Sequence, residues 1–215
     1  MTDFVLVRHG ETVWHAENRY AGRTDVPLTE QGRKQAAELG AWAAGQRLDG
    51  GPERRQRLDA VLSSPLSRAR LTAEPAAAAL GLTPRVDERL YEVDFGRGEG
   101  LTRAEMRERF PAELDAFLTD PVAHHLPGGE DPAAAADRAI GCLTDIAQEV
   151  PEGRVLVVAH STLVRLVLCQ LLGIPLARYR QVFPRLENGA LTELRLRHGR
   201  ASLLRLNAPA TAARP

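Results

Sequence analysis

The chain opens with a short apolar run that ends in a cation, an imidazole and a glycine. Phe4–Val7 leads directly into Arg8, His9 and Gly10. An unbroken run of Phe, Val and Leu bounded by glycine is typical of a strand covered on both faces, as in a parallel sheet. Ligands of such sheets collect at the carboxyl ends of the strands, where His9 lies. Gly10 lets the backbone turn sharply and approach a ligand closely. The run therefore predicts a buried strand that delivers His9 to a binding site.

Two further apolar runs end in polar residues in the same way. Val155–Ala159 precedes His160 and Ser161, and Leu58–Leu62 precedes a segment that reaches Arg68. We expect the three strand ends to bring two histidines and two arginines around one point. The planar fork of arginine matches pairs of phosphate oxygens, and a neutral histidine is a nucleophile for phosphoryl transfer. The sequence thus predicts a pocket for a phosphate dianion.

The order of the expected elements indicates an α/β fold. A chain of 215 residues can bury a sizeable core, and we expect one domain over residues 1–207. The segments 191–196 and 202–206, joined around His198 and Gly199, predict an antiparallel hairpin at the edge of a mostly parallel sheet. The Ala/Pro-rich segment 208–215 is expected to be a disordered tail.

Helix starts are marked by capping residues and prolines. Thr29 is the expected N-cap of a helix that ends near Gly45. Ser64, followed by a proline, is the expected N-cap of a helix with Arg68 at its start, where the helix dipole would support anion binding. Pro75 is expected to kink or split that helix. Residues 49–57, rich in Gly, Pro and Arg, are interpreted as a surface loop.

Composition gives no sign of a polyanionic partner. The chain has 28 Lys and Arg against 28 Asp and Glu, so we expect neither a nucleic acid nor a membrane partner. Cys142 and Cys169 lie in apolar helical patterns without the spacing of a zinc site, which predicts buried free thiols. We recognise no targeting segment and no apolar run of membrane-spanning length, and a cytoplasmic location is expected.

Several motifs, taken together and in this order, resemble the histidine phosphatase superfamily, which includes the cofactor-dependent phosphoglycerate mutases. The resemblance runs from about Phe4 to Leu206. It implies a three-layer sandwich, with helices on both faces of the sheet. The motifs are Arg8–Thr12, Asp25–Gly32, Ser64–Ala69, Leu90–Glu92 with Phe95–Gly96, and Ala159–Ser161.

The resemblance also implies roles for individual residues. Glu92 matches the carboxyl group that protonates the departing oxygen, with Asp94 and Glu99 as nearby competitors. A positioned acid of this kind typically contributes about 10²–10⁴-fold to the rate. Arg103 stands where the mutases carry a basic residue that contacts substrate. The family usually has a phosphate-contacting asparagine at the position of His15.

Either His15 or Asn18 is therefore expected to take the role of the missing asparagine. Gly22 and Ser161 complete the expected substrate-binding set. The loop 119–129, which contains His124 and His125, is expected to help discriminate substrates, and we interpret these two histidines as solvated loop residues.

The function expected from these residues is that of a metal-independent phosphomonoesterase. His9 would form a phosphohistidine, Arg8, Arg68 and His160 would clamp the phosphoryl group, and Glu92 would act as acid and then base. Neither a cofactor nor a metal ion is expected, because the protein supplies the cations and no metal-ligand spacing occurs. The expected partner is a small phosphorylated metabolite, whose identity the sequence does not reveal.

Two alternatives stay open. One is a 2,3-bisphosphoglycerate-dependent phosphoglycerate mutase, which is disfavoured because Ala21 replaces a Ser or Thr of the mutases and the region around residues 119–120 is short. The other is a non-catalytic phosphate-binding protein. The exposed edge hairpin also offers a surface for a homodimer.

Overall fold

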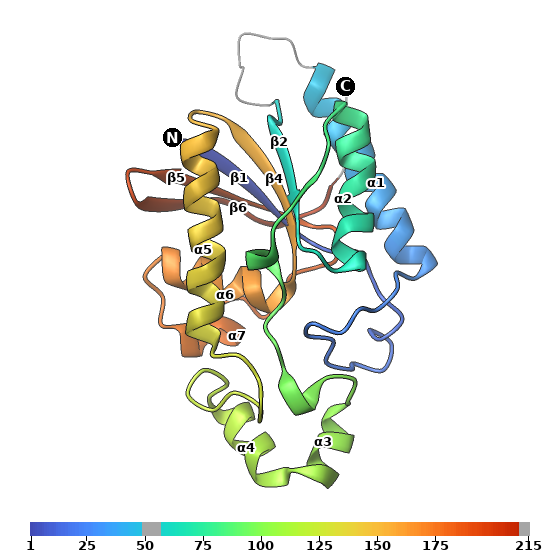
Figure 1. Ribbon diagram of the computed structural model, residues 1–215, viewed down its shortest axis with the longest axis vertical. Helices are drawn as coiled ribbons and strands as arrows, with labels where there is room; N and C mark the ends of the chain where they lie inside the picture. Colours follow the sequence, from blue (N-terminus) through green and yellow to red (C-terminus); the bar gives the residue numbers. More distant parts are fainter. Residues whose placement is uncertain (49–56, 211–215) are drawn as a thin grey trace.

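The chain folds around a six-stranded sheet in the computed structural model, which describes residues 1–48 and 57–210 (Figure 1). The strand order is β3-β2-β4-β1-β5-β6. The first four strands in this order are parallel, and β5 and β6 are antiparallel to their neighbours. The strands are β1 (Thr2–Arg8), β2 (Ala60–Ser63), β3 (Arg85–Val86), β4 (Arg154–Ala159), β5 (Leu191–Arg197) and β6 (Arg200–Ala208).

Helices cover both faces of this sheet, so the predicted three-layer α/β sandwich is confirmed (Figure 1). The α-helices are α1 (Glu30–Leu48), α2 (Ser67–Leu80), α3 (Arg103–Arg109), α4 (Pro111–Thr119), α5 (Pro132–Glu149), α6 (Ser161–Leu171) and α7 (Tyr179–Val182). The described residues also form the short 3₁₀ helices η2 (Glu88–Leu90), η3 (Gly96–Gly98) and η4 (Leu176–Arg178). None of the helices in the described ranges is long and apolar enough to cross a membrane.

The continuous apolar run of β1 is explained by burial on both faces. Phe4 and Leu6 belong to a core cluster with residues of α5 and α6. Val5 and Val7 belong to a second cluster with residues of α1 and α2. Successive side chains of a strand point to opposite faces, so only a strand between two helical layers needs every position apolar.

The register of the central strands brings the two expected histidines together. Arg8 of β1 pairs with Ala159 of β4, and the backbone N–H of His9 donates to the carbonyl of Ala159 at 3.0 Å. His160 follows Ala159 directly. Because the strands are parallel, both histidines leave the sheet at the same edge, as the sequence predicted.

The helix that contains Arg68 differs from the sequence expectations at two points. The helix of Arg68 begins at Ser67, and Ser64 is not its N-cap. The Ser64 hydroxyl instead contacts Nε2 of His160 at 2.8 Å, a tertiary partner that local sequence does not reveal. The same helix runs unbroken through Pro75 to Leu80, and its C-cap residue Gly81 has a φ of 69°. Proline thus neither splits nor ends this helix.

The first long helix starts as predicted and ends later than predicted. The Thr29 hydroxyl accepts a bond from the N–H of Gly32 at 3.0 Å, which is the expected capping contact. The helix passes Gly45 and continues to Leu48. Of the segment 49–57 interpreted as a surface loop, residues 49–56 lie outside the described residues.

The C-terminal hairpin is confirmed at the edge of the sheet. His198 and Gly199 form its turn with φ values of 49° and 72°, the left-handed conformation that two-residue hairpin turns require. The tail predicted from residue 208 is wrong at its start, because Ala208 pairs with Leu191 and Ala210 packs on the core. Residues 211–215 lie outside the described residues. Cys142 and Cys169 are buried free thiols, as predicted.

Candidate active site

A cavity of about 670 Å³ opens at the carboxyl ends of the central strands. Three segments supply most of its wall: residues 12–22 after β1, residues 102–104 at the start of α3, and residues 161–165 at the start of α6. Arg8, His9, Arg68 and Glu92 also line it. The structure thus gathers the predicted nucleophile, both predicted arginines and the predicted acid in one cavity.

His9 is held in one tautomer by its own backbone neighbour. Its Nδ1 lies 2.7 Å from the carbonyl oxygen of Gly10. A carbonyl can only accept, so Nδ1 carries the proton and Nε2 keeps its lone pair. Burial, followed by the charges of Arg68 and Arg8, lowers the pKa of His9 well below its usual value of 6.5. His9 is therefore a neutral imidazole with an unprotonated Nε2.

Gly10 is held in place by residues distant in sequence. Its N–H donates to the hydroxyl of Thr72 on α2 at 2.9 Å, and that hydroxyl donates to the carbonyl of Arg68. The sequence predicted that the missing Cβ of Gly10 allows a ligand to approach. In the structure that space is taken by the backbone of Gly32 on α1, against which a Cβ would press.

Two arginines stand beside His9, of which Arg68 is buried and Arg8 is half-buried. Arg68 is 1% exposed and donates to the carbonyls of Thr24 and Gly22, at 2.8 and 2.7 Å. Arg8 donates to the carbonyl of Leu186 at 2.7 Å. Burial is the main cause that lowers the pKa of Arg68, and that of Arg8 to about 10. A guanidinium is protonated at neutral pH in proteins, so both side chains carry a charge.

Three buried nitrogens around His9 have no hydrogen-bond partner among the described residues. They are Nε of Arg8, Nε of Arg68 and Nδ1 of His160. His160 is fully buried, with its ring centroid 5.2 Å from that of His9, and its Nε2 contacts Ser64. Buried polar atoms are nearly always satisfied in proteins. Three unpaired nitrogens on the predicted clamp mark a place for an anion that accepts several hydrogen bonds.

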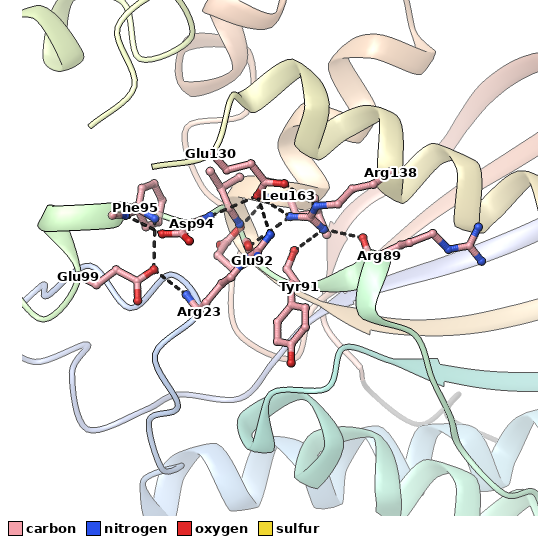
Figure 2. A network of polar contacts seen from close by, with 12 residues as sticks. Arg23, Arg89, Tyr91, Glu92, Asp94, Phe95, Glu99, Glu130, Arg138 and Leu163 are labelled. Atoms are coloured by element: carbon pink, nitrogen blue, oxygen red, sulfur yellow. Dashed lines mark hydrogen bonds and ion pairs between the residues drawn. The ribbon is translucent and has the colours of Figure 1, made fainter. Parts of the chain in front are cut away.

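Glu92 is fixed at the first turn of α6. Its carboxylate accepts from the backbone N–H groups of Thr162 at 3.0 Å and Leu163 at 2.9 Å, and from that of Val93 at 2.9 Å (Figure 2). Free N–H groups at a helix N-terminus are natural partners of a carboxylate. They hold the side chain at the cavity, where only 6% of the residue is exposed.

Arg138 on α5 binds the backbone of residues 89–91, the segment that leads to Glu92. Figure 2 shows its guanidinium between Glu130 and the chain leading to Glu92. It pairs with both oxygens of Glu130, at 2.7 and 2.8 Å, and donates to the carbonyls of Arg89 and Tyr91, at 2.6 and 2.8 Å. A planar fork with several fixed donors suits this clamp.

Glu99 and Asp94, the competing acids, are engaged elsewhere. The carboxylate of Glu99 accepts from the N–H groups of Arg23, Thr24 and Phe95, and from the Thr24 hydroxyl (Figure 2). Asp94 accepts from the N–H of Gly96 at 2.7 Å. Neither lines the main cavity. The loop that Glu99 holds is the one whose carbonyls bind Arg68, so Glu99 acts on the site through that loop.

His15, and not Asn18, contacts the phosphate clamp. Nε2 of His15 lies 2.5 Å from Nη2 of Arg8. A guanidinium can only donate, so Nε2 accepts, while Nδ1 lies 2.8 Å from the Thr12 hydroxyl and 3.0 Å from the Thr12 backbone nitrogen. Burial and Arg8 lower the pKa of His15. Asn18 lines the outer cavity on an exposed turn with a φ of 55°.

The remaining predicted residues divide into two groups. Ser161, Arg103 and Gly22 line the cavity, as expected of substrate-binding residues. The loop 119–129, expected to help discriminate substrates, contributes no residue to its lining. That loop instead packs on η3, where the Pro127 carbonyl accepts from the N–H of Arg97 at 3.0 Å. His124 and His125 are exposed, as interpreted from the sequence.

Sequence reasoning missed several residues that complete the site. Thr72 supports Gly10, Arg138 supports the Glu92 segment, and the Asn188 amide donates to the carbonyl of His9 at 2.7 Å. Arg165 on α6 lines the cavity. Thr72 and Arg165 lie beyond the motif residues of their helices, and Arg138 and Asn188 lie in segments without a motif. Only tertiary contact brings these side chains to the site. Among residues 1–48 and 57–210, no group of three or more His, Cys, Asp or Glu is arranged to hold a metal ion.

Comparison with known proteins identifies the class to which this fold and site belong. The profile of the histidine phosphatase superfamily (branch 1) matches residues 4–209. Phosphoserine phosphatase 1 of Hydrogenobacter thermophilus is 31% identical over 207 residues, covering 96% of this chain and 92% of the relative. The probable phosphoglycerate mutase GpmB of Salmonella choleraesuis is 32% identical over 195 residues, covering 90% and 85%.

A solved structure agrees with this result. YhfR of Bacillus stearothermophilus superposes with a TM-score of 0.84 at 29% identity, covering 97% of this chain and 98% of that one. The chain belongs to the histidine phosphatase superfamily, and its enzyme class is that of the phosphoric monoester hydrolases.

Proposed function

We propose that this protein hydrolyses a phosphomonoester of a small metabolite through a phosphohistidine on His9, without a metal ion. The observation that carries the proposal is the state of His9 and its surroundings. The imidazole is neutral, its Nε2 is unprotonated, and three nitrogens of Arg8, Arg68 and His160 near it have no partner among the described residues. This combination supplies a nucleophile together with a receptor for the phosphoryl oxygens.

In the first step, the lone pair of His9 Nε2 attacks phosphorus while the bond from phosphorus to the ester oxygen breaks. Glu92 gives its proton to the departing oxygen. In the second step, Glu92 takes a proton from water, the water oxygen attacks phosphorus, and the nitrogen–phosphorus bond breaks. Inorganic phosphate leaves and neutral His9 is restored. Arg8 and Arg68 stabilise the charge on the transferring group throughout.

Hydrolysis is favoured over transfer to a second substrate by the composition of the cavity wall. Ala21 lines the cavity and offers no hydroxyl group. The short segment after α4 supplies no lining residue. Both features support water as the acceptor. The mutase reaction is the competing outcome, because a probable phosphoglycerate mutase is among the relatives.

The test is phosphate release from a panel of phosphomonoesters in the presence of EDTA. We expect the native protein to turn over and His9→Ala to lose at least ~10³-fold, which corresponds to about 4 kcal/mol of transition-state stabilisation. His124→Ala, which changes an exposed histidine away from the cavity, is the matched control. Brief exposure to ³²P-labelled substrate followed by denaturation should leave an acid-labile, base-stable label on the native protein.

Loss of activity on chelation would contradict the metal-free mechanism. An unlabelled native protein that still turns over would contradict the covalent step. Phosphate binding without any turnover would support the non-catalytic alternative.

A further inference from the structure

A second cavity of about 340 Å³ adjoins the first. The two cavities share lining residues, among them Arg103, Thr162 and Arg165. Thr162 is also the residue whose N–H binds the Glu92 carboxylate. The second cavity therefore borders the same part of the wall as Glu92.

Arginine dominates the wall of this second cavity. Arg103 comes from α3, Arg165 from α6 and Arg180 from α7. No aspartate or glutamate lines it within the part of the chain that the structure describes. The ring residues Tyr20, Phe95 and Tyr179 fill much of the remaining wall. The wall of the cavity therefore combines positively charged side chains with aromatic rings.

These three arginines lack the carboxylate partners that other arginines have. Arg19, Arg89 and Arg138, for example, each pair with an acid at 2.6 or 2.7 Å. Within residues 1–48 and 57–210, no ion pair is found for Arg103, Arg165 or Arg180. Nε of Arg165 is buried and has no hydrogen-bond partner among the described residues.

Neutral contacts hold the three guanidinium groups in place. Arg180 lies over the ring of Phe117 at 4.6 Å and over that of Tyr179 at 5.3 Å. Arg165 donates to the carbonyl of Pro184 at 3.1 Å, and Arg103 to the hydroxyl of Tyr20 at 3.4 Å. Stacking and neutral acceptors orient a guanidinium without neutralising it. The charges are thus preorganised and available to a ligand.

Burial is the main cause that lowers the pKa of Arg165, and the nearby charge of Arg180 adds to it. Like charges gathered in one cavity repel each other, and an anion bound between them would remove that repulsion. A fork of guanidinium donors matches the oxygens of a carboxylate or a phosphate.

We propose that Arg165 and Arg180, with Arg103 at the rim, bind a second anionic group on the substrate, so that the preferred substrates are phosphomonoesters that also carry a carboxylate or a further phosphate. This inference rests on the proposed function, because it places the first phosphoryl group at His9. It names the substrate class that the motifs alone left open.

The test compares substrates that differ only in the second anion. O-phosphoserine and O-phosphoethanolamine differ by a carboxylate, and fructose 1,6-bisphosphate and fructose 6-phosphate differ by a phosphate. We expect the native protein to prefer the doubly anionic member of at least one pair in kcat/KM. Arg180→Gln should reduce that preference about tenfold, since a charge-assisted contact is lost. The pair that responds identifies the second anion as carboxylate or phosphate.

Two matched variants separate this role from a structural one. Arg180→Lys keeps the charge and should retain part of the preference. Arg178→Gln removes an exposed charge two residues away, at a position that does not line the cavity, and should leave the preference intact. A structural defect would instead lower both members of a pair alike.

Calorimetric binding of the same four compounds to His9→Ala tests the second-anion site independently of turnover. If no compound is hydrolysed but Arg180→Gln in the His9→Ala background weakens only the doubly anionic ligands, the second-anion site stands and the proposed hydrolysis falls. If hydrolysis proceeds but both pairs show no preference, or a preference that Arg180→Gln leaves unchanged, the second-anion site is wrong.

Discussion

His9 reaches its reactive state through contacts with its immediate neighbours. The Gly10 carbonyl sets its tautomer, and burial beside Arg8 and Arg68 keeps it uncharged. A free histidine near neutral pH is partly protonated and exchanges tautomers. The site removes both sources of heterogeneity before substrate arrives, so the nucleophile is preorganised and not created by the ligand.

His15 gives a prediction at this scale. Its Nε2 accepts from Arg8, a role that the side-chain oxygen of asparagine can also fill. We expect His15→Ala to lower kcat/KM about tenfold, because a hydrogen bond to a charged partner is lost, and His15→Asn to keep most of the activity. Steady-state kinetics on the best phosphomonoester measures both. His125→Ala, an exposed histidine outside the cavity, serves as the control, and equal activity of His15→Ala and His15→Asn would count against this role.

At the scale of elements, the loop after β1 is built together with the segment around Glu99. The Glu99 carboxylate binds the backbone of Arg23 and Thr24, and the carbonyls of Gly22 and Thr24 bind Arg68. The side chain of Arg23 also lies 3.5 Å from Glu130. The loop that contains Gly22 and Thr24 thus orients Arg68, and Glu99 holds that loop in place.

Gly22→Ala tests this coupling. Gly22 has a φ of 48°, and an added Cβ would collide with the Glu99 carboxylate. Either the Glu99 carboxylate must leave its bonds to the loop or the loop must move, and the positive φ adds strain. We expect at least a tenfold loss of kcat/KM and a loss of about 1–3 kcal/mol in the free energy of unfolding. Gly141→Ala on α5 is the matched control, because nothing lies within 4 Å of its added Cβ. That variant should keep its activity and gain up to about 1 kcal/mol.

Arg138 gives a second prediction at this scale. Arg138→Lys keeps a charge near Glu130 but cannot reproduce the fork that binds the Arg89 and Tyr91 carbonyls. We expect kcat to fall about tenfold with little change in KM, because the position of Glu92 matters most when the leaving oxygen takes its proton. Arg107→Lys, on the exposed Arg107–Asp115 ion pair, is the control. A rise in KM alone would show that Arg138 does not act through Glu92.

At the scale of the whole molecule, the site is a concentration of buried polar groups inside an apolar core. His9, His160 and Arg68 are all less than 7% exposed. Burial lowers the pKa values of His9 and His160 well below 6.5, and that of His15 below its usual value. In the unfolded chain these histidines titrate normally.

Stability should therefore depend on pH with a definite sign. Below about pH 6.5 these histidines bind protons in the unfolded chain but stay neutral in the folded chain. The free energy of unfolding therefore falls as the pH drops. The limiting slope is about 1.4 kcal/mol per pH unit for each such histidine. Denaturant unfolding between pH 7.5 and 5.5 measures it. His160→Gln should reduce the slope, whereas His198→Gln, in the exposed hairpin turn, should not. A slope that His160→Gln leaves unchanged would contradict the assignment.

Much of the fold and the centre of the site could be predicted from sequence, because those signals are local. The apolar runs of β1 and β4 identify buried strands, and the residue that follows each strand must lie at the same sheet edge. His9, His160, Arg8 and Arg68 were found in this way, and Glu92 through the family resemblance. The Thr29 cap and the hairpin turn at His198 are equally local.

Only the tertiary structure decided how these groups are held and what surrounds them. Ser64 has the local pattern of a helix cap but contacts His160, because burial brings the two side chains together. Asn188 and Arg138 reach the site from segments without motifs, and Thr72 reaches it from a part of α2 beyond the motif that ends at Ala69. The sequence determines which polar side chains stand at the end of each strand, because the strand and these residues are adjacent in the chain. It does not fix which distant side chains meet there, since those contacts depend on how the layers pack.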